Sequence, residues 1–485
     1  MTLRKLISSL KPLDIQGPLD REITDVVCDS RQARPGVLFV AVRGVAVDAH
    51  RFIPQVVEAG AAAVVCEQLP DLPDPDVTFV RVENATVALA LLAGEWYGHP
   101  SEHLKLVGVT GTNGKTTIAT LLYELMQSLG HKTGLLSTVK NVIDRTEQPA
   151  AQTTPDHLTL NRLLRQMVDA GCEYAFMEVS SHACAQHRID GVHWAGGIFT
   201  NLTQDHLDYH KTMQEYLRAK QMFFDSLPTE AFALTNLDDR NGPIMVQNTR
   251  ARRYTYSLRR MADFKTRVVE ERIDGMTLDF GGTPTEVLLT GRFNAQNLTA
   301  VYAAAVLLGV DPHQAAVKMS TLLPADGRFQ TIAMPGGVTA IVDYAHTPDA
   351  LANVLDTIVE LLRGKKGNII TVCGCGGNRD ATKRPVMAHT AAVRSQRVIL
   401  TSDNPRNEDP DAILRDMEAG LTDDDRKHTI KITDRTEAIR TAVMMAQPGD
   451  VVLVAGKGHE TYQEINGVKH HFDDREKLRE LIDKR

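Results

Sequence analysis

Residues 108–117 read Gly-Val-Thr-Gly-Thr-Asn-Gly-Lys-Thr-Thr, and this stretch decides the fold. The apolar run at 104–109 predicts a strand before it, and the run at 117–129 predicts a helix after it. A glycine-rich turn between a strand and a helix is typical of a phosphate-binding loop, because its free backbone N–H groups point at the anion. We expect Lys115 to contact the phosphates and the Thr116 hydroxyl to bind Mg²⁺.

The match to the usual phosphate-loop pattern is imperfect at one position. That pattern has glycine five residues before Gly114, where this chain has Val109, and glycines stand at 108 and 111 instead. A glycine turn that binds nothing is the alternative interpretation. Because the predicted strand and helix lie on the sides that a phosphate loop requires, we favour phosphate binding.

Length and composition predict a multidomain globular protein. A chain of 485 residues suggests about three domains, and its 43% hydrophobic content is enough for separate cores. The formal net charge of −7 argues against a nucleic-acid partner. The first ten residues lack the apolar core of a secretory signal, and no apolar run reaches membrane-spanning length. We therefore expect a cytoplasmic protein that is not inserted in a membrane.

Six cysteines are scattered along the chain, at positions 28, 66, 172, 184, 373 and 375. This spacing fits a reducing compartment better than a disulfide framework. Cys373 and Cys375 are close together, but no second cysteine pair lies near them. We expect the end of a strand at this pair and not a zinc site.

Three segments follow one another along the chain, and we assign them as domains 1–102, 103–332 and 333–485. Gly98-His99-Pro100-Ser101 has the composition of the first boundary, and Pro335-Gly336-Gly337 that of the second. In the middle segment, predicted strands and helices alternate before a strand-rich patch at 252–289 and a helix at 297–308. This alternation predicts a mainly parallel sheet covered by helices.

The last segment has the clearest pattern, that of a doubly wound sheet. Strands are predicted at 339–343, 368–372, 397–401, 429–432 and 450–454, and helices at 349–362, 385–393, 410–420 and 435–446. Ligands of such sheets bind beyond the carboxyl ends of the strands. Polar or glycine-rich loops are predicted there at 343–346, 374–380, 403–406 and 456–460. Ordinary surface turns explain one such loop easily and four poorly, so we expect a binding face.

Further candidate catalytic residues follow predicted strands of the middle segment. Glu178 ends one strand and could bind the magnesium of a nucleotide, since Mg²⁺ takes one or two carboxylates and keeps several waters. The stretch 201–210 carries two aspartates and two histidines after another strand. A single histidine is more often structural, but this cluster near a phosphate loop favours a function. Lys220 would by default be a solvated helix residue.

Together these motifs resemble those of the Mur ligases, which build the peptide of bacterial peptidoglycan. Residues 111–117 match the Mur form of the phosphate loop, which accounts for the displaced glycine. Within the family the chain is most similar, along its full length, to the UDP-N-acetylmuramoyl-tripeptide synthetases. The other matching stretches are 28–31, 153–155, 178–188, 201–210, 291–294, 343–348, 403–406 and 456–460.

The resemblance implies an α/β protein of three domains. These are an N-terminal uridine-nucleotide-binding domain, a central phosphate-loop ATPase with a mainly parallel sheet, and a C-terminal Rossmann-like domain that receives the amino acid. ATP and two Mg²⁺ ions are the implied cofactors. The implied substrates are UDP-N-acetylmuramoyl-L-alanyl-D-glutamate and meso-diaminopimelate, because Asp403-Asn404-Pro405-Arg406 resembles the signature of the diaminopimelate-adding type. We expect a monomer.

Diaminopimelate differs from lysine by a second carboxylate at its far end. A guanidinium can bind that carboxylate through two parallel hydrogen bonds, and Arg406 is the natural candidate. Glu460 could pair with the distal ammonium. The resemblance assigns diaminopimelate binding to Arg379, Asp403, Asn404, Pro405, Arg406, Gly456 and Glu460.

The resemblance also assigns the other sites. ATP would contact Gly111, Thr112, Asn113, Gly114, Lys115, Thr116, Thr117, Asn297, Arg328, Asp343 and His346. The nucleotide-sugar would contact Ser30, Thr153, Thr154, Ser180, Gln186 and Arg188. The metals would lie near Thr116, Glu178, His206 and Lys220, the last as a carbamate formed with carbon dioxide. The implied catalytic residues are Lys115, Glu178, His206 and Lys220.

Three positions depart from the family pattern. Gly44-Val45-Ala46-Val47-Asp48 lacks the polar residues often seen in the uridine loop, so we expect backbone contacts there. Gln152 stands where some relatives have asparagine, and Gln330 stands where many members have glutamate. None of the three belongs to the expected central chemistry.

By resemblance, the acceptor carboxylate attacks the γ-phosphate of ATP and forms an acyl phosphate, from which the amine of diaminopimelate then displaces phosphate. Two alternatives remain open. The chain could be another ligase of the superfamily, adding lysine or D-alanyl-D-alanine, or a folylpolyglutamate synthetase. It could also be a nucleotide-dependent binding or regulatory protein that has lost catalysis.

Overall fold

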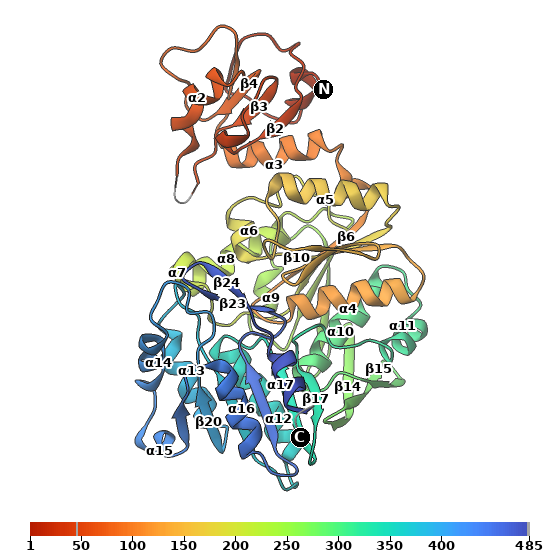
Figure 1. Ribbon diagram of the computed structural model, residues 1–485. Coiled ribbons are helices and arrows are strands. Elements are labelled where there is room, and N and C mark those ends of the chain that lie inside the picture. Colours follow the sequence, from red (N-terminus) through yellow and green to blue (C-terminus); the bar gives the residue numbers. More distant parts are fainter. Residues whose placement is uncertain (45–46, 483–485) are drawn as a thin grey trace.

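Within residues 1–44 and 47–482, which the structure describes, three large β-sheets follow one another along the chain (Figure 1). They divide this computed structural model into an N-terminal, a middle and a C-terminal unit. Val45 and Ala46 of the expected uridine loop lie outside the described residues, as does the end of the chain from 483 to 485.

The N-terminal unit holds a sheet of strand order β1-β5-β4-β3-β2, parallel except for β1. Its strands are β1 (Asp14–Gln16), β2 (Asp25–Val27), β3 (Val37–Val40), β4 (Ala63–Cys66) and β5 (Thr78–Arg81), and its helices are α1 (Leu3–Leu6), α2 (Ile53–Glu58) and α3 (Ala85–Trp96). Apolar residues of α1 and α3 pack on one face and those of α2 on the other. Every residue of β3 and β4 is therefore buried.

The middle unit holds a long sheet of order β16-β15-β14-β13-β12-β11-β6-β10-β7-β8-β9. Its strands are β6 (Lys105–Thr110), β7 (Thr133–Leu136), β8 (Lys140–Ile143), β9 (Thr146–Pro149), β10 (Tyr174–Glu178), β11 (Gly196–Phe199), β12 (Phe232–Asn236), β13 (Arg252–Ser257), β14 (Phe264–Arg272), β15 (Gly275–Phe280) and β16 (Thr283–Val287). Neighbouring strands from β7 to β14 are parallel, and antiparallel strands extend the sheet at both ends.

Helices cover both faces of this middle sheet. They are α4 (Lys115–Ser128), α5 (His157–Asp169), α6 (Ser181–Ala185), α7 (Leu207–His210), α8 (Met213–Asp225), α9 (Gly242–Met245), α10 (Arg292–Leu307) and α11 (Pro312–Met319). Residues of α4 and α10 share one hydrophobic cluster and residues of α5 and α8 another. The phosphate-loop residues thus lie between a buried strand, β6, and a buried helix, α4.

The C-terminal unit is the doubly wound sheet that the sequence predicts. Its order is β17-β18-β22-β19-β20-β21, parallel except for β17. The strands are β17 (Gln330–Met334), β18 (Val338–Asp343), β19 (Ile369–Cys373), β20 (Arg397–Leu400), β21 (Thr429–Lys431) and β22 (Val451–Ala455), and a separate hairpin pairs β23 (Tyr462–Ile465) with β24 (Val468–His471). The helices are α12 (Pro348–Leu362), α13 (Lys383–Ala392), α14 (Pro410–Glu418), α15 (Asp423–Arg426), α16 (Arg435–Met445) and α17 (Asp474–Ile482).

Two sequence-based expectations differ from the structure. Pro335-Gly336-Gly337 forms the turn between β17 and β18, with Gly336 and Gly337 at positive φ, and does not link two units. The expected boundary at 332 therefore falls inside β17, a strand of the C-terminal sheet. The helix expected at 297–308 begins earlier, at Arg292. Its first turns hold the buried polar residues Asn294 and Asn297, so the apolar pattern starts only after the helix has begun.

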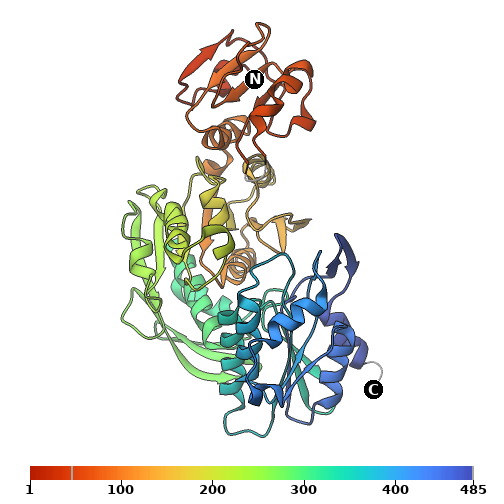
Figure 2. The same ribbon diagram turned by 90° about the vertical axis from the view of Figure 1, so that its left-hand side faces the viewer.

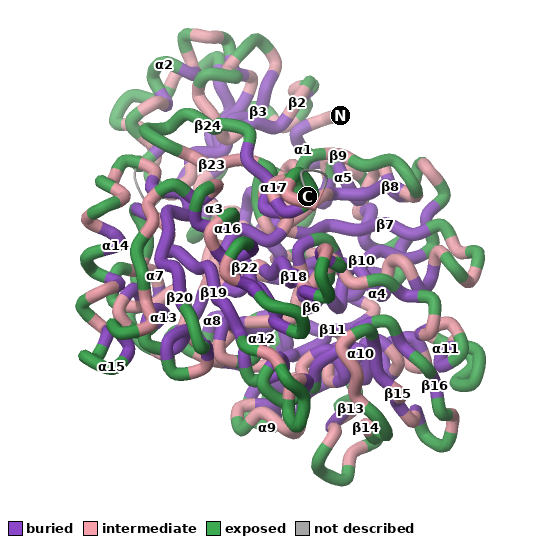
Figure 3. The backbone as a smooth tube through the Cα atoms, turned by 60° about the horizontal axis from the view of Figure 1, so that its bottom comes forward, coloured by how far each residue is buried: buried purple, intermediate pink, exposed green. Residues whose placement is uncertain are grey.

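The N-terminal unit (red) lies at one end of the molecule and the C-terminal unit (blue) toward the other (Figure 2). Helices α3 and α5 lie side by side where the N-terminal unit meets the middle one. Buried residues are concentrated in the sheets, whereas β24 is exposed along its length (Figure 3). No helix among the described residues is long and apolar enough to cross a membrane.

Candidate active site

The phosphate loop joins β6 to α4, as the sequence predicts. Gly111 and Gly114 have φ angles of 150° and 90°. A Cβ on Gly111 would lie 1.8 Å from Thr200 Oγ1, and one on Gly114 would lie 2.6 Å from Asn297 Oδ1. Both positions therefore require glycine. The Lys115 ammonium lies over the loop and donates to the carbonyls of Gly111 (2.9 Å) and Thr112 (2.8 Å).

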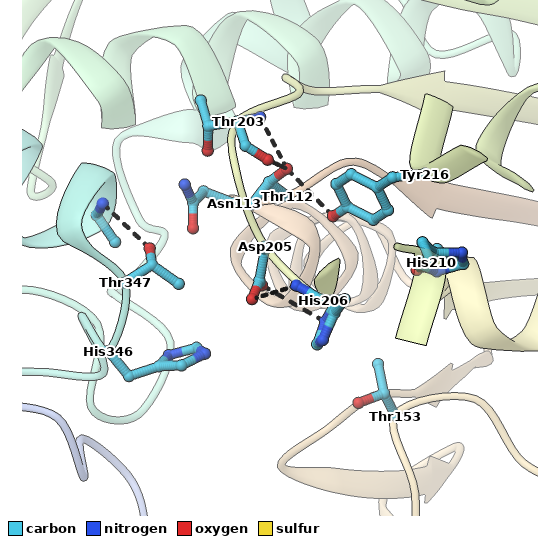
Figure 4. Close-up of polar contacts among 12 residues, drawn as sticks. Thr112, Asn113, Thr153, Thr203, Asp205, His206, His210, Tyr216, His346 and Thr347 are labelled. Carbon is cyan, nitrogen blue, oxygen red and sulfur yellow. Dashed lines mark hydrogen bonds and ion pairs between the residues drawn. The ribbon is translucent and has the colours of Figure 1, made fainter. Parts of the chain in front are cut away.

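Residues after β11 fix the conformation of this loop. The Asn113 N–H donates to Asn201 Oδ1 (3.0 Å), and its carbonyl accepts from Thr200 Oγ1 (2.6 Å). The Thr112 hydroxyl donates to the carbonyl of Thr203 and accepts from its N–H (Figure 4). Because every one of these contacts holds the backbone in place, the loop is pre-organised for an anion.

Glu178 and Thr116 provide oxygen atoms beside the loop. Thr116 Oγ1 donates to Glu178 Oε1 at 2.9 Å, and the carboxylate also accepts from the backbone N–H and the hydroxyl of Thr138. Glu178 is 1% exposed. No group of three or more His, Cys, Asp or Glu side chains in the described residues is arranged to hold a metal. A carboxylate and a hydroxyl on one edge fit Mg²⁺, which takes few protein oxygens and keeps its waters.

Lys220 is not the solvated helix residue that its position on α8 suggests. It is 1% exposed, its Nζ donates to the Gly111 carbonyl at 2.8 Å, and it lies 4.6 Å from the centre of the Tyr216 ring. Burial, together with the nearby charge of Lys115, holds the pKa of Lys220 well below its usual value. The structure therefore places a buried amine of lowered pKa beside the phosphate loop.

Two histidines, one from the middle unit and one from the C-terminal unit, lie near the loop. His206 lies 3.4 Å from Asp205 in the middle unit, and His346 of the C-terminal unit points toward this pair (Figure 4). Burial lowers the pKa of His206 and that of His346 from 6.5 to about 4 each. Both rings are neutral at physiological pH and can accept a proton or a metal on one nitrogen.

A cavity of about 640 Å³ lies between the middle and C-terminal units and joins these groups. Of the expected site residues it is lined by Thr112, Asn113, Gly114, Lys115, Thr116, Thr117, Thr153, Glu178, Ser180, His206, Lys220, Asn297, Arg328, Asp343 and His346. Arg328 reaches the loop directly, because its Nη2 donates to Thr116 Oγ1 at 3.1 Å. Asp343 is held by the N–H groups of Phe329 and Ala345, each at 2.7 Å.

The expected nucleotide-sugar residues of the middle unit form a second group next to Glu178. Thr154 Oγ1 donates to the Glu178 carbonyl at 2.8 Å and contacts Ser180 Oγ at 3.3 Å. Arg188 donates to the Thr154 carbonyl (2.8 Å), to Gln186 Oε1 and to the amide oxygen of Gln152. Ser30 begins a short 3₁₀ helix (Ser30–Gln32) of the N-terminal unit and does not belong to this hydrogen-bonded group.

The expected amino-acid residues gather at the carboxyl ends of β19, β20 and β22. Asn404 Nδ2 donates to Glu460 Oε2 at 2.8 Å, and buried Lys457 donates to Asn404 Oδ1 and to the same Glu460 oxygen, each at 3.0 Å. A Cβ on Gly456 would lie 2.6 Å from Asp403 Oδ2. Burial raises the pKa of Glu460, and the charge of Asp403 adds to this effect.

Arg406 lies beside these residues, after Pro405. Its Nη1 donates to the Gly377 carbonyl at 2.9 Å, and its Nε lies 3.4 Å from Glu464 Oε2. Its backbone adopts a φ of 52°, and its N–H donates to the carbonyl of Glu464 in β23. Arg379 is exposed on the neighbouring loop, where its Nη1 donates to the Asn378 carbonyl.

Asp349, Lys457 and Glu464 also lie at these sites, although their sequence pattern does not single them out. Asp349 lines the cavity and contacts the phosphate loop from the first turn of α12. Glu464 lies on β23, whose burial pattern has no fully buried position, so no apolar alternation predicts the strand. Lys457 lies within the 456–460 loop that the sequence did predict to be part of a binding face, but nothing in the pattern indicates that it is buried.

Comparisons with known proteins agree with this arrangement. Three family models match the chain: "Mur ligase family, catalytic domain" at residues 22–97, "Mur ligase middle domain" at 109–305, and "Mur ligase, glutamate ligase domain" at 327–458. A UDP-N-acetylmuramoyl-L-alanyl-D-glutamate–2,6-diaminopimelate ligase from Parabacteroides distasonis is 58% identical over 482 residues, which cover 99% of each chain. The chain belongs to the Mur ligase family.

Solved structures of other Mur ligases share the fold. A ligase with the same name as the Parabacteroides protein is 33% identical, with a TM-score of 0.70 over 100% of this chain and 99% of that chain. A MurF ligase from Thermotoga maritima in complex with ADP is 20% identical, with a TM-score of 0.60 over 96% of this chain and 97% of that chain. The expectation of a three-domain α/β Mur ligase is confirmed.

Proposed function

We propose that this Mur ligase adds meso-diaminopimelate to UDP-N-acetylmuramoyl-L-alanyl-D-glutamate, with cleavage of ATP to ADP and phosphate. The observation that carries the proposal is the group at the carboxyl ends of β19, β20 and β22. There the guanidinium of Arg406 lies next to the network of Asn404, Lys457 and Glu460. The relative at 58% identity is named for this reaction. We place the reaction in the cytoplasm and the enzyme in a monomeric state.

The carboxylates of Asp403 and Glu460, with the cations of Lys457 and Arg406, suit a diamino acid. Lys457 balances one of the charges of Asp403 and Glu460, and the remaining negative charge is complementary to a substrate ammonium. Arg406 keeps donors beyond those directed at Gly377 and Glu464, since a guanidinium carries five N–H groups. These donors are available to a carboxylate at the far end of the amino acid, which lysine lacks.

In the proposed reaction, a carboxylate oxygen of the D-glutamate residue attacks the γ-phosphorus of ATP, and the bond to the β–γ bridging oxygen breaks to release ADP. The amine of diaminopimelate then attacks the acyl carbon, loses a proton, and displaces phosphate. The phosphate loop holds the triphosphate through backbone N–H groups and Lys115. Lys115 also offsets the repulsion between the attacking carboxylate and the triphosphate.

Two Mg²⁺ ions are part of the proposal, and Thr116, Glu178 and His206 are the residues that would hold them. When bound, Mg²⁺ would neutralise the charge of the phosphates. We also propose that Lys220 carries a carbamate. Its buried amine of lowered pKa supports this modification, because a lowered pKa increases the neutral fraction of the amine, and the neutral form is the one that reacts with carbon dioxide.

The binding of the nucleotide-sugar is assigned by the same proposal to Ser30 and to the group of Thr153, Thr154, Ser180, Gln186 and Arg188. We propose that the domain at residues 1–102 binds this substrate and that the domain beginning at residue 103 binds ATP. The sheet membership of β17 moves our boundary for the amino-acid domain from 333 to a point before Gln330.

The test is ADP release by the purified enzyme with UDP-N-acetylmuramoyl-L-alanyl-D-glutamate and one amino acid at a time. We expect release with meso-diaminopimelate and little with lysine, ornithine or D-alanyl-D-alanine. Release with lysine alone would assign the chain to the lysine-adding ligases. Release with none of them would favour a non-catalytic nucleotide-binding protein.

A further inference from the structure

The first turn of α12, in the C-terminal unit, contacts the phosphate loop of the middle unit. Asp349 Oδ2 accepts a hydrogen bond from Asn113 Nδ2 at 3.0 Å and another from Thr203 Oγ1 at 3.2 Å. It also accepts one from Asn353 of its own helix at 3.3 Å. One carboxylate oxygen thus joins the two units through donors that lie 146 and 236 residues before Asp349 in the sequence.

Asn113 belongs to the phosphate loop and Thr203 to the segment after β11 that holds this loop, and both donors are fixed. The Asn113 backbone is held through its N–H and its carbonyl by Asn201 and Thr200. The Thr203 backbone is held through both of its polar groups by the Thr112 hydroxyl. Their side chains therefore have a defined position only while the loop keeps its conformation, and Asp349 is bound to that conformation.

A second, apolar contact joins the same two units elsewhere. The rings of Phe293 and Phe329 lie 5.8 Å apart, and Phe293 and Ile273 pack against the hydrophobic core of the C-terminal unit. The cavity is lined by Phe293 and by Asp349, so it extends between the two contacts. The apolar contact lies at the crossing between the units, residues 320–329, which includes Phe329. Asp349 makes its contact elsewhere, at the phosphate loop of the middle unit.

We propose that Asp349 is a positioning residue that fixes the C-terminal unit to the phosphate loop, so that the amino-acid loops are held over the activated carboxylate. This inference rests on the proposed function for its kinetic consequence. A purely structural role is the competing explanation, because an acidic residue in the first turn of a helix stabilises that helix on its own.

The chain offers variants that separate these explanations. Asp349→Ala removes both contacts to the middle unit, and Asp349→Asn keeps an oxygen acceptor at the same place. Asp356→Ala is the matched control, because Asp356 lies on the same helix and forms an ion pair with Arg394 inside the C-terminal unit. Thr203→Val removes one donor and keeps the shape of the side chain.

The kinetic test compares the amino-acid step with nucleotide binding. We expect Asp349→Ala to lower kcat/KM for diaminopimelate by about 10- to 100-fold, as for the loss of charge-assisted hydrogen bonds, mainly through a higher KM. The dissociation constant of ADP, measured by calorimetry, should change by less than about threefold, since the proposal places Asp349 on the loop and not on the nucleotide. Asp349→Asn should show a smaller loss of the same kind, and Asp356→Ala should match the wild type.

Thr203→Val should lose less kcat/KM than Asp349→Ala. The double variant should lose no more than Asp349→Ala, because the contact that Thr203→Val breaks is one of the two that Asp349→Ala already removes. Fully additive losses would overturn the proposal. So would kinetics of Asp349→Ala equal to those of Asp356→Ala, or a loss of ADP binding as large as the loss of turnover.

A scattering measurement tests the same contact without turnover. With ADP and Mg²⁺ bound, we expect Asp349→Ala, or Asp349→Asn if the alanine variant does not fold, to have a larger radius of gyration than the wild type. Identical scattering curves would overturn the proposal. If the wild-type enzyme did not use diaminopimelate, the proposed function would fail, and the scattering result would still decide the role of Asp349.

Discussion

Replacing Arg406 with methionine is the sharpest test of how the amino acid is selected. The side chain is only 19% exposed, and two of its nitrogens already face Gly377 and Glu464, so the guanidinium is held in one place. Methionine keeps an unbranched side chain as far as the position of Nε, and it keeps the same strain at a φ of 52°. The substitution therefore isolates the loss of the charged donors.

The size of the effect follows from the contact that is lost. Two hydrogen bonds between a partly buried guanidinium and a carboxylate contribute about 2–4 kcal/mol, which corresponds to roughly 30- to 1,000-fold in kcat/KM for diaminopimelate. Lysine has no carboxylate at that end, so its kcat/KM should change by less than about threefold. Any general damage to the loop, including the loss of a partner for Glu464, affects both substrates and cancels in their ratio.

The assay is steady-state ADP release with diaminopimelate and with lysine, for the wild type, Arg406→Met and Arg415→Met. Arg415 is the matched control, because it is an exposed arginine of the neighbouring helix α14 that pairs with Asp409. An equal loss with both amino acids would refute selection through the far carboxylate and reduce Arg406 to a structural residue. Full activity with an unchanged ratio of kcat/KM for diaminopimelate to kcat/KM for lysine would refute it as well.

Three further predictions concern the ATP side and the stability of the fold. Lys220→Ala should lose most of its activity and regain part of it with added formate or acetate, and full activity without them would exclude a carbamate. Glu178→Gln should raise the Mg²⁺ concentration for half-maximal activity at least about tenfold, since a carboxylate ligand is lost, and an unchanged Mg²⁺ titration would contradict its assignment. Because the pKa of His346 falls from 6.5 to about 4 on folding, the unfolded chain takes up a proton that the folded chain does not, so stability is full above pH 6.5 and decreases as pH falls from 6.5 to 4. Thermal melts should show this decrease, and it should be smaller in His346→Gln; equal pH dependence of the two proteins would contradict it.

Local sequence signals predict the elements that are buried on both sides. Strands that precede the ligand-binding loops, such as β6 and β22, are mostly apolar, and α4 follows its glycine turn directly. Exposed elements carry no such signal. All four residues of β24 are exposed, so the hairpin that brings Glu464 to Arg406 has no apolar alternation. Pro335-Gly336-Gly337 suits a linker and a hairpin turn equally well, and only the pairing of β17 with β18 decides between them.

The functional side chains divide in a similar way. Lys115 and Thr116 are predicted by the loop itself, because the chemistry and the local structure share one stretch of sequence. Lys220 and Asp349 are ordinary helix residues in sequence. Their proposed roles depend on contacts with Gly111 and Asn113, more than 100 residues away along the chain. Such tertiary contacts leave no local pattern, and for Lys220 only the family resemblance indicated a function.

A competition experiment tests the central claim most directly. The enzyme would receive ATP, Mg²⁺, UDP-N-acetylmuramoyl-L-alanyl-D-glutamate and an equimolar mixture of meso-diaminopimelate, lysine, ornithine and D-alanyl-D-alanine, and the products would be identified by mass spectrometry. The account predicts a single nucleotide-linked product whose mass increases by one diaminopimelate residue, formed together with one ADP and one phosphate. A lysine-containing product as the main species, or no product while ATP remains intact, would contradict it.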